Sequence, residues 1–417
     1  MTLIKTSFLS FVATAFKMLA GLVINKAVAM YIGPVGLALI GQFQNFSQIV
    51  MTAAQGAINS GVTKYSAEYR KDDKHISILF STASKISFAS SVIVGAGIVS
   101  FSSHASQYVL HSDDYSYVFV IFGFTILLFV INSLLLSILN GLQDIKTWAI
   151  INITQSIYSL IFTTLLIVFL GLDGALVALV TNQSVVLLIV LWMLRNHRLI
   201  KLENFKGKFD AAIGKKLGAF SLMAITSAIT IPVSHLIIRN FIGEKFGWDA
   251  AGYWQAVWYI STTYLMVVTN TLSVYYLPKL SEIKNKAELR KELLNGYKII
   301  MPIVIFMSVV IYFLKDFIIW LLFTEQFAPM KELFLWQLVG DVTKIAALLI
   351  AYLMLAKAMT KTFIITEIAF SISFVFLSIW FTSQSGLIGM SYAFALNYGL
   401  YFIVMIFATK REWSGFD

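Results

Sequence analysis

Two charged residues lie in the middle of an apolar segment in the C-terminal half of the chain. Residues 333–356 read LFLWQLVGDVTKIAALLIAYLMLA, which is long enough to cross a bilayer and carries Asp341 and Lys344 near its centre. A charge at the bilayer centre costs about 2.5–3.5 kcal/mol on insertion scales. Either the two side chains pair with each other at the i, i+3 spacing of a helix, or their face of the helix meets water.

Cations outnumber anions inside the apolar segments. Lys17 lies too close to the middle of its segment to reach the interface, whereas snorkelling explains Lys85, two turns from a segment end. Cavity walls of one sign concentrate ligands of the opposite sign, and Lys and Arg both bind phosphate oxygens. We therefore predict that an anionic cargo is bound by four cations: Lys17, Lys26, Arg239 and Lys344.

The main buried anion is Asp341, and Glu367 lies one turn into a later apolar segment. We hypothesise that Asp341, with Glu367, binds a proton or another coupling cation, and that Lys344 is then freed for cargo. The structural alternative is a permanent Asp341–Lys344 ion pair. Pro232 lies two turns before Arg239 and predicts a bend, which is either a hinge or an inert kink.

Polar residues recur at helical spacing in several of these segments. A few polar residues are explained by hydrogen bonds between helices, each worth about 0.6 kcal/mol in lipid. A stripe over five turns is satisfied more simply by water. We predict that a hydrated lumen is lined by Gln42, Asn45, Gln48, Thr52, Gln55, Asn59 and, from a later segment, Gln255.

The composition excludes a soluble protein. The chain has 417 residues, of which 59% are hydrophobic and 12% are charged, whereas soluble domains contain about 25% charged residues. Long apolar runs predict an all-α polytopic membrane protein with about twelve transmembrane helices. The predicted spans are 7–30, 36–60, 77–102, 116–140, 148–170, 174–194, 217–242, 251–277, 299–323, 333–356, 363–383 and 386–409.

Basic residues fix the predicted orientation and the domain division. Of the 31 Lys and Arg residues, 23 fall in the loops on one side and two in the loops on the other. The positive-inside rule then places both termini in the cytoplasm, and it explains the net charge of +10 without nucleic acid. The widest loop predicts an N-terminal six-helix bundle over 1–196, a basic cytoplasmic linker over 197–216 and a C-terminal bundle over 217–417.

Motifs for covalent chemistry are missing from the sequence. It has no cysteine, no G-x-x-x-x-G-K-[ST] loop for ATP, no G-x-S-x-G and no H-E-x-x-H, and its five histidines do not cluster. We predict neither a cofactor nor a metal site. No loop exceeds about 22 residues, so the chain is predicted to be a transporter and not an enzyme.

Several long stretches resemble the Wzx-type flippases of the multidrug/oligosaccharidyl-lipid/polysaccharide (MOP) superfamily, in particular the enterobacterial common antigen branch. The resemblance runs along the whole chain and is strongest in the C-terminal half. Among the residues that this chain shares with the family are Lys17, Lys26, Arg239-Asn240, Trp254-Gln255 and the run 336–341. The stretches are NSGVTKYSAEY (59–69), LIIRNFIGEKFGWDAAGYWQAV (236–257), SVYYLPKLSEI (273–283), KDFIIWLLFTEQFAPMKELFLWQLVGDVTK (315–344) and LAKA (355–358).

The resemblance implies two six-helix bundles around a central cavity in a bacterial inner membrane. The implied cargo is an undecaprenyl-pyrophosphate-linked oligosaccharide of the O-antigen (lipopolysaccharide) or enterobacterial common antigen type, moved from the cytoplasmic to the periplasmic leaflet by alternating access. Its pyrophosphate would be bound by the four cations named above. Trp254 becomes a candidate sugar-stacking surface, although a Trp at the end of a span is also typical of an interface anchor. The implied partners are the bilayer, a Wzy-type polymerase and a chain-length regulator.

Other functions remain open on the sequence alone. A multidrug/cation antiporter of the same superfamily would favour acidic residues in the lumen, against the cation excess seen here. A membrane-embedded glycan polymerase or ligase usually has a large external loop, and the external loops predicted here are short. A non-transporting scaffold is the remaining alternative.

Overall fold

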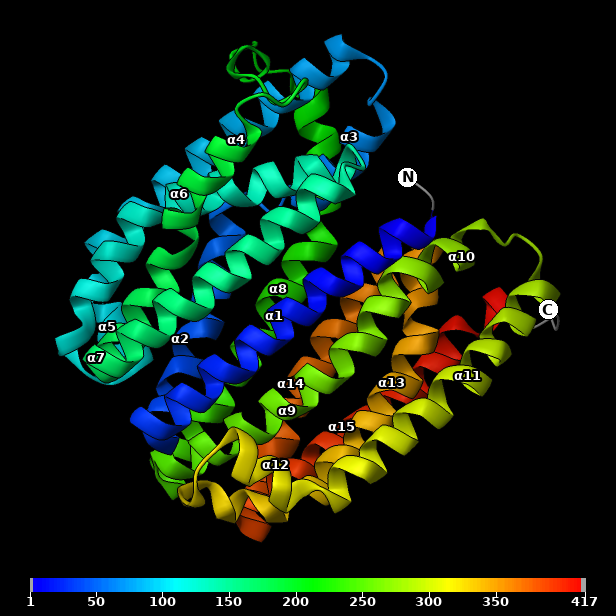
Figure 1. The fold of residues 1–417 in the computed structure, drawn as a ribbon. Helices are drawn as coiled ribbons and strands as arrows, with labels where there is room; N and C mark the ends of the chain where they lie inside the picture. The colour runs from blue at the N-terminus through cyan, green and yellow to red at the C-terminus, as the bar shows by residue number, and fades with distance from the viewer. Residues whose placement is uncertain (1–2, 414–417) are drawn as a thin grey trace. The chain divides into compact units, whose positions relative to one another are not determined.

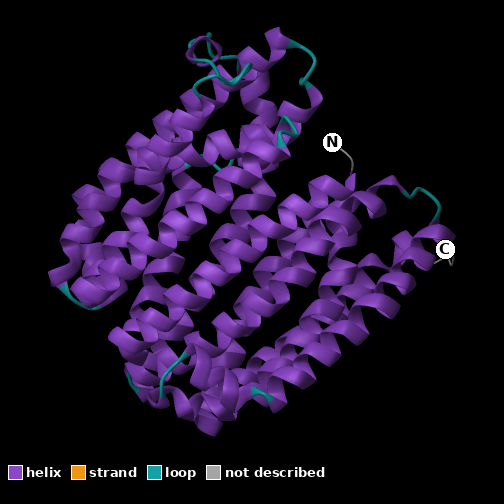
Figure 2. Cartoon of the chain, in the orientation of Figure 1, coloured by secondary structure: helices purple, strands orange, loops and turns teal. Residues whose placement is uncertain are grey.

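Every regular element in the part of the chain that the structure describes is helical. The structure is a computed structural model that describes residues 3–413, and Figures 1 and 2 show helices joined by short loops in that range. The predicted all-α class is confirmed. The long helices are α1 (Leu3–Tyr31), α2 (Gly33–Ala54), α4 (Asp73–Ser100), α6 (Ser116–Gly141), α7 (Ile145–Leu194), α8 (Ala211–Phe246), α9 (Trp248–Thr271), α11 (Lys286–Phe313), α13 (Phe334–Ala356), α14 (Thr360–Ser385) and α15 (Gly389–Trp413).

Short helices connect the long ones. Four are α-helical: α3 (Asn59–Glu68), α5 (Ser102–Leu110), α10 (Leu277–Glu282) and α12 (Lys315–Leu322). A π-helical turn, η3 (Leu272–Tyr276), joins α9 to α10. The described range also contains the 3-10 segments η1 (Asp113–Tyr115), η2 (Leu202–Phe205), η4 (Glu325–Leu333) and η5 (Gly386–Ile388).

The helices agree with the twelve predicted crossings. Eight stretches of the described residues are long and apolar enough to cross a membrane, and two of them, Ile145–Leu194 and Thr360–Trp413, are long enough to cross twice. The first is divided at Gly171, whose φ of 58° and ψ of −128° interrupt α7. The remaining two crossings are α2 and α9, which lie outside those eight stretches because their polar residues lower their mean hydropathy.

The chain forms two compact units. The first contains Met1–Ile32 and Leu39–Pro232, and the second contains Gly33–Ala38 and Val233–Asp417. The chain passes from the first unit to the second inside α8, at Pro232. The predicted division into 1–196, 197–216 and 217–417 stays a prediction. The 197–216 segment is tied to α4: Phe205 stacks on Phe80 at 5.5 Å between ring centroids.

In the first unit, α1 lies along α7, and α6 packs between α4 and α7. Figure 1 shows α4, α5 and α6 side by side, in agreement with their contacts. Asp72 caps the start of α4 by accepting from the backbone N–H groups of Lys74 and His75. These N–H donors and the His75 ring lower the pKa of the Asp72 carboxyl.

In the second unit, α13 packs against α15, α11, α14 and α9. Close approach of α13 to α15 requires a glycine, since a Cβ added at Gly340 would lie 2.2 Å from Phe394 Cδ1. Many large apolar side chains remain exposed on the long helices of both units, among them Phe169 at 77% and Phe407 at 70%. On membrane-spanning helices such residues contact lipid.

Candidate functional site

Asp341 is fully buried and accepts two hydroxyl donors. Its Oδ2 receives a hydrogen bond from Ser261 Oγ at 2.7 Å and another from Tyr264 Oη at 2.9 Å, both on α9. Its Oδ1 has no hydrogen-bond partner among the described residues, and neither has the amide nitrogen of Gln337, one turn earlier on α13. The second carboxyl oxygen and the Gln337 amide therefore lie in one fully buried polar group, and the Gln337 side chain acts on the Asp341 carboxyl.

Lys344 does not pair with Asp341. No ion pair among the described residues joins them. The Lys344 ammonium instead lies 5.0 Å from the ring centroid of Trp258, 5.4 Å from that of Tyr398 and 5.9 Å from that of Phe394. The face of an aromatic ring attracts a cation, so these three rings stabilise the charge of the half-buried Lys344. The permanent ion pair that the sequence left open is absent from this conformation.

Arg239 is buried in the same unit, with 1% of its surface exposed. Its Nη2 donates to Gln255 Oε1 at 2.5 Å, and its guanidinium lies 5.5 Å from the ring centroid of Trp254. His235, one turn earlier on α8, packs against Trp254 and Trp258 with centroid separations of 5.2 and 4.2 Å. The tryptophans thus connect the surroundings of Arg239 to those of Lys344.

The helical repeat explains how α9 reaches both charged groups. Trp254, Trp258 and Ser261 recur at intervals of four and three residues, which places them on one face. Gly252 lets this helix approach the chain at Pro34, because an added Cβ would lie 2.1 Å from the Pro34 carbonyl oxygen. Trp254 is itself 1% exposed. In this conformation it is part of the core, and neither lipid nor a sugar ring reaches it.

The buried charges of the second unit are balanced. The buried Arg239 and the half-buried Lys344 are matched in number by two carboxyl groups, the buried Asp341 and the half-buried Glu367 on α14. The charges of Asp341 and Glu367 both act on Lys344. The excess of cations predicted from the sequence therefore comes from α1, in the first unit.

On α1, Lys17 is exposed and Lys26 is half-buried. They are nine positions apart, which is two and a half helical turns, so they lie on opposite faces of α1 and about 13 Å apart along its axis. Asn25 lies beside Lys26 and is 5% exposed. These lysines belong to the first unit, and their role in cargo binding stays a prediction.

The polar stripe of α2 is shorter than the sequence suggested. The helix ends at Ala54, because Gly56 and Ala57 adopt positive φ values of 65° and 52°. Gln55 follows the last turn, and Asn59 begins α3. The predicted single stripe over five turns is therefore wrong in its last two members.

The stripe residues also differ in exposure. Gln42 is 0% exposed, Asn45 and Thr52 are half-buried, and Gln48 is exposed. Asn59 Nδ2 donates to Gln55 Oε1 at 2.7 Å and to Ser133 Oγ at 2.8 Å. Hydrogen bonds within and between helices thus account for Gln55 and Asn59, and Thr52 Oγ1 donates to the Gln48 carbonyl at 2.8 Å. A water-lined face at Asn45 and Gln48 stays a prediction.

Sequence reasoning missed the partners of Asp341. It assigned the polar face of the eighth span to Gln255 and residues in step with it, whereas Ser261 and Tyr264 are the hydroxyl donors. The signal available was the i, i+3 spacing of a Ser and a Tyr on a segment that also carries two tryptophans. Which face of α9 meets α13 is decided by tertiary packing, and the periodicity of one segment does not contain it.

Comparison with known proteins identifies the family. A family described as "Polysaccharide biosynthesis protein" matches residues 43–332. The chain is 31% identical over 403 residues to proteins named Lipid III flippase from Escherichia coli (strain K12) and Shigella flexneri, covering 96% of this chain and 97% of each relative. The chain belongs to the polysaccharide biosynthesis protein family. As a member of this flippase-containing family it is a transporter, which confirms the prediction that it is not an enzyme.

Solved structures show the fold of this family member. A multidrug resistance MATE family transporter of the MOP superfamily in an inward-facing conformation has a TM-score of 0.80 at 15% identity, covering 95% of this chain and 94% of that one. A MOP superfamily transporter from Pyrococcus furiosus has a TM-score of 0.74 at 15% identity, with coverages of 97% and 94%. The predicted MOP-type helical fold is confirmed.

Proposed function

We propose that this chain flips an undecaprenyl-pyrophosphate-linked oligosaccharide from the cytoplasmic to the periplasmic leaflet of a bacterial inner membrane. The observation that carries this proposal is full-length similarity to proteins named Lipid III flippase. The cargo combines an anionic pyrophosphate, a polar glycan and a lipid tail. The 23 to 2 distribution of basic loop residues supports cytoplasmic termini. In that orientation the cargo would be loaded from the side that carries the basic loops.

The pyrophosphate contacts are assigned to Arg239, Lys344, Lys17 and Lys26. Arg239 is bonded to Gln255 and buried, so it contacts phosphate only in a conformation in which Gln255 releases it. Such a requirement is natural in alternating access, where binding groups are exposed in one state and enclosed in another. Phosphate oxygens would replace the Gln255 carbonyl as the acceptor for the guanidinium.

The glycan contacts are assigned to Trp254, Gln255 and the accessible polar residues of α2. The release of Arg239 frees the Gln255 amide and uncovers one face of Trp254, because the guanidinium now lies over that ring. A freed indole face suits the apolar face of a sugar ring. Pyrophosphate and sugar would then be recognised by neighbouring groups in one step.

The coupling step is assigned to Asp341, together with Glu367. Asp341 presents an unpartnered Oδ1 in a fully buried position. Protonation of that oxygen removes a buried charge and weakens the attraction that Asp341 exerts on Lys344. Lys344 would then become available to cargo. Pro232, at the division between the two units, is the proposed hinge.

A drug/cation antiporter of the same fold is the second candidate. The likeness to multidrug transporters is at 15% identity and concerns the fold. The cations of α1, added to a balanced second unit, disfavour a cationic drug. A Wzy-type polymerase and a chain-length regulator are the partners we propose on the periplasmic side, since they would consume a flipped repeat unit.

Reconstituted transport tests the function. Full-length protein in liposomes is given a fluorescent polyprenyl-pyrophosphate oligosaccharide, and quenching by an impermeant reductant reports the fraction in the outer leaflet. Wild type should equilibrate the leaflets, Arg239→Glu should slow flipping at least tenfold, and Arg239→Lys should retain part of the rate. A protein that flips no such lipid and instead exports cationic dyes would contradict the proposal and support the antiporter.

A further inference from the structure

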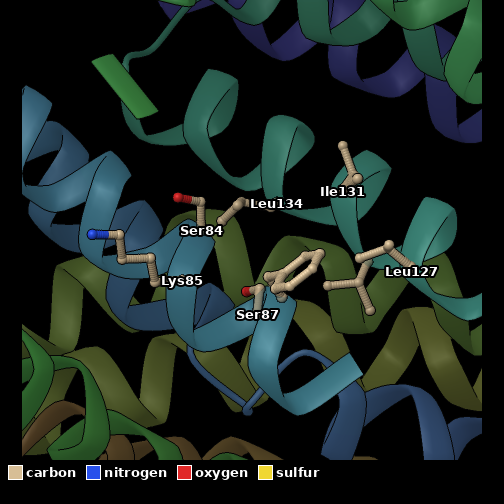
Figure 3. A pocket seen from close by; sticks show the side chains of 8 residues that line it. Ser84, Lys85, Ser87, Leu127, Ile131 and Leu134 are labelled. Carbon is tan, nitrogen blue, oxygen red and sulfur yellow. The ribbon is translucent and has the colours of Figure 1, made fainter. Parts of the chain in front are cut away.

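A crevice of about 340 Å³ lies between α4 and α6 in the first unit (Figure 3). Helix α6 contributes only apolar side chains to it, and α4 contributes a lysine, two serines and a phenylalanine. The crevice is lined by Ser84, Lys85, Ser87, Phe88, Leu127, Val130, Ile131 and Leu134. Nothing in the proposed transport step uses these residues.

The faces that flank this crevice are lipid-facing. On α4 the exposed residues that follow Lys85 at helical spacing are apolar: Phe88 is 57% exposed, Val92 is 48% exposed and Ile93 is 72% exposed. On α6, Phe124 is 73% exposed. Apolar side chains exposed along a membrane-spanning helix contact acyl chains. The crevice therefore opens to hydrocarbon, and an apolar chain is what fits against its wall.

Lys85 is the exception on this apolar face. It is exposed, and its ammonium has no hydrogen bond or ion pair among the described residues. It lies about 18 Å along the axis from the start of α4 at Asp73. Figure 3 shows its amine pointing away from Leu127 and Ile131. Long helical side chains lean toward the helix N-terminus, which for α4 is the predicted cytoplasmic end, so the amine points toward the headgroups.

Ser87 supplies a second polar group. Its side chain lines the crevice and is 3% exposed, and its Oγ has no hydrogen-bond partner among the described residues. The neighbouring Ser84 hydroxyl is satisfied, since it donates to the Ser81 carbonyl at 3.0 Å. A buried unpaired hydroxyl in an apolar wall is costly unless a ligand accepts from it. A cation therefore lies at the rim of the crevice, and an unpartnered hydroxyl lies buried in its wall.

We propose that this crevice binds one anionic phospholipid of the cytoplasmic leaflet. Its phosphate binds the Lys85 ammonium, its ester carbonyl accepts from Ser87, and one acyl chain packs against Leu127 and Ile131. The ester distinguishes this ligand from a polyprenyl cargo, because an isoprenoid chain carries no carbonyl next to its phosphate for Ser87 to bond. The site lies wholly within the first unit and is independent of the transported substrate.

Native mass spectrometry of the full-length protein, titrated with lipids in detergent, tests the site. Phosphatidylglycerol should bind one copy more tightly than phosphatidylethanolamine. Lys85→Gln should weaken the binding of phosphatidylglycerol about tenfold, as expected for the loss of one charge-assisted hydrogen bond. It should also abolish the preference for phosphatidylglycerol over phosphatidylethanolamine. Ile131→Trp fills the crevice and should weaken both lipids. Lys146→Gln is the charge-matched control. Lys146 is exposed near the start of α7 and does not line the crevice, so this variant should change the binding of neither lipid.

Three outcomes would overturn the proposal. The first is equal retention of phosphatidylglycerol by wild type and by both crevice variants. The second is an equal loss of phosphatidylglycerol binding in Lys85→Gln and Lys146→Gln, which would indicate nonspecific attraction of the lipid to surface charge. The third is displacement of phosphatidylglycerol by undecaprenyl phosphate with the higher affinity at this crevice, which would make it a cargo-tail site. Unchanged melting temperatures of the variants would exclude misfolding as the cause of any loss.

Discussion

The Asp341 carboxyl shows how a buried charge is accommodated on a bilayer-spanning helix. One oxygen accepts from Ser261 and Tyr264, while the other has no partner in the described chain. The nearest cation on its own helix, Lys344, is held by three aromatic rings. The carboxyl and the ammonium thus make their direct contacts with different groups, although their charges act on each other. The carboxyl can therefore change protonation without breaking an ion pair.

Asp341→Asn should keep the protein folded, because the amide preserves the shape and can still accept from Ser261. It should remove the dependence of flipping on an imposed proton gradient. Flipping in liposomes with and without a gradient measures this, and Glu325→Gln, a carboxyl outside the core of the unit, is the control. A variant at position 341 that keeps the full dependence on the gradient would eliminate Asp341 as the coupling group.

At the scale of the elements, close helix contacts bring these groups together. Sequence periodicity was sufficient to place the long helices, since apolar runs and helical spacing are local properties. It did not locate the end of α2, where Gly56 and Ala57 adopt positive φ. It also did not find the hydroxyl donors of Asp341, because Tyr264 lies 77 residues away in sequence and the contact depends on which face of α9 meets α13.

Gly340→Ala should destabilise the second unit by about 1–3 kcal/mol, the usual cost of overpacking. Even the single added carbon would lie 2.2 Å from Phe394. Gly399→Ala on α15 is the matched control, since no atom lies within 4 Å of its added Cβ, and the helix gains from alanine. Thermal unfolding in detergent compares them, and equal melting temperatures would show that α13 and α15 do not need this close contact.

At the scale of the whole molecule, the charge distribution sets the orientation and the family sets the fold. The absence of cysteine from the sequence makes the orientation directly measurable, because single-cysteine variants have no background. The positive-inside argument predicts that residue 206 faces the cytoplasm and residue 325 the opposite side.

An impermeant maleimide should label Glu325→Cys in intact spheroplasts and Lys206→Cys only after permeabilisation. Both residues are exposed, so accessibility across the membrane decides the labelling. Labelling of the position-206 variant in sealed spheroplasts would contradict the predicted orientation and with it the proposed direction of transport.

The most direct test of the flippase account is the lipid content of cells that lack this gene. Lipid extracts analysed by mass spectrometry should show accumulated undecaprenyl-pyrophosphate-linked oligosaccharide, whose sugar masses would name the cargo. Wild-type protein and Arg239→Lys should clear it at least partly, and Arg239→Glu should not. No accumulation, in cells with no other flippase of this family and with surface polysaccharide unchanged, would contradict the account.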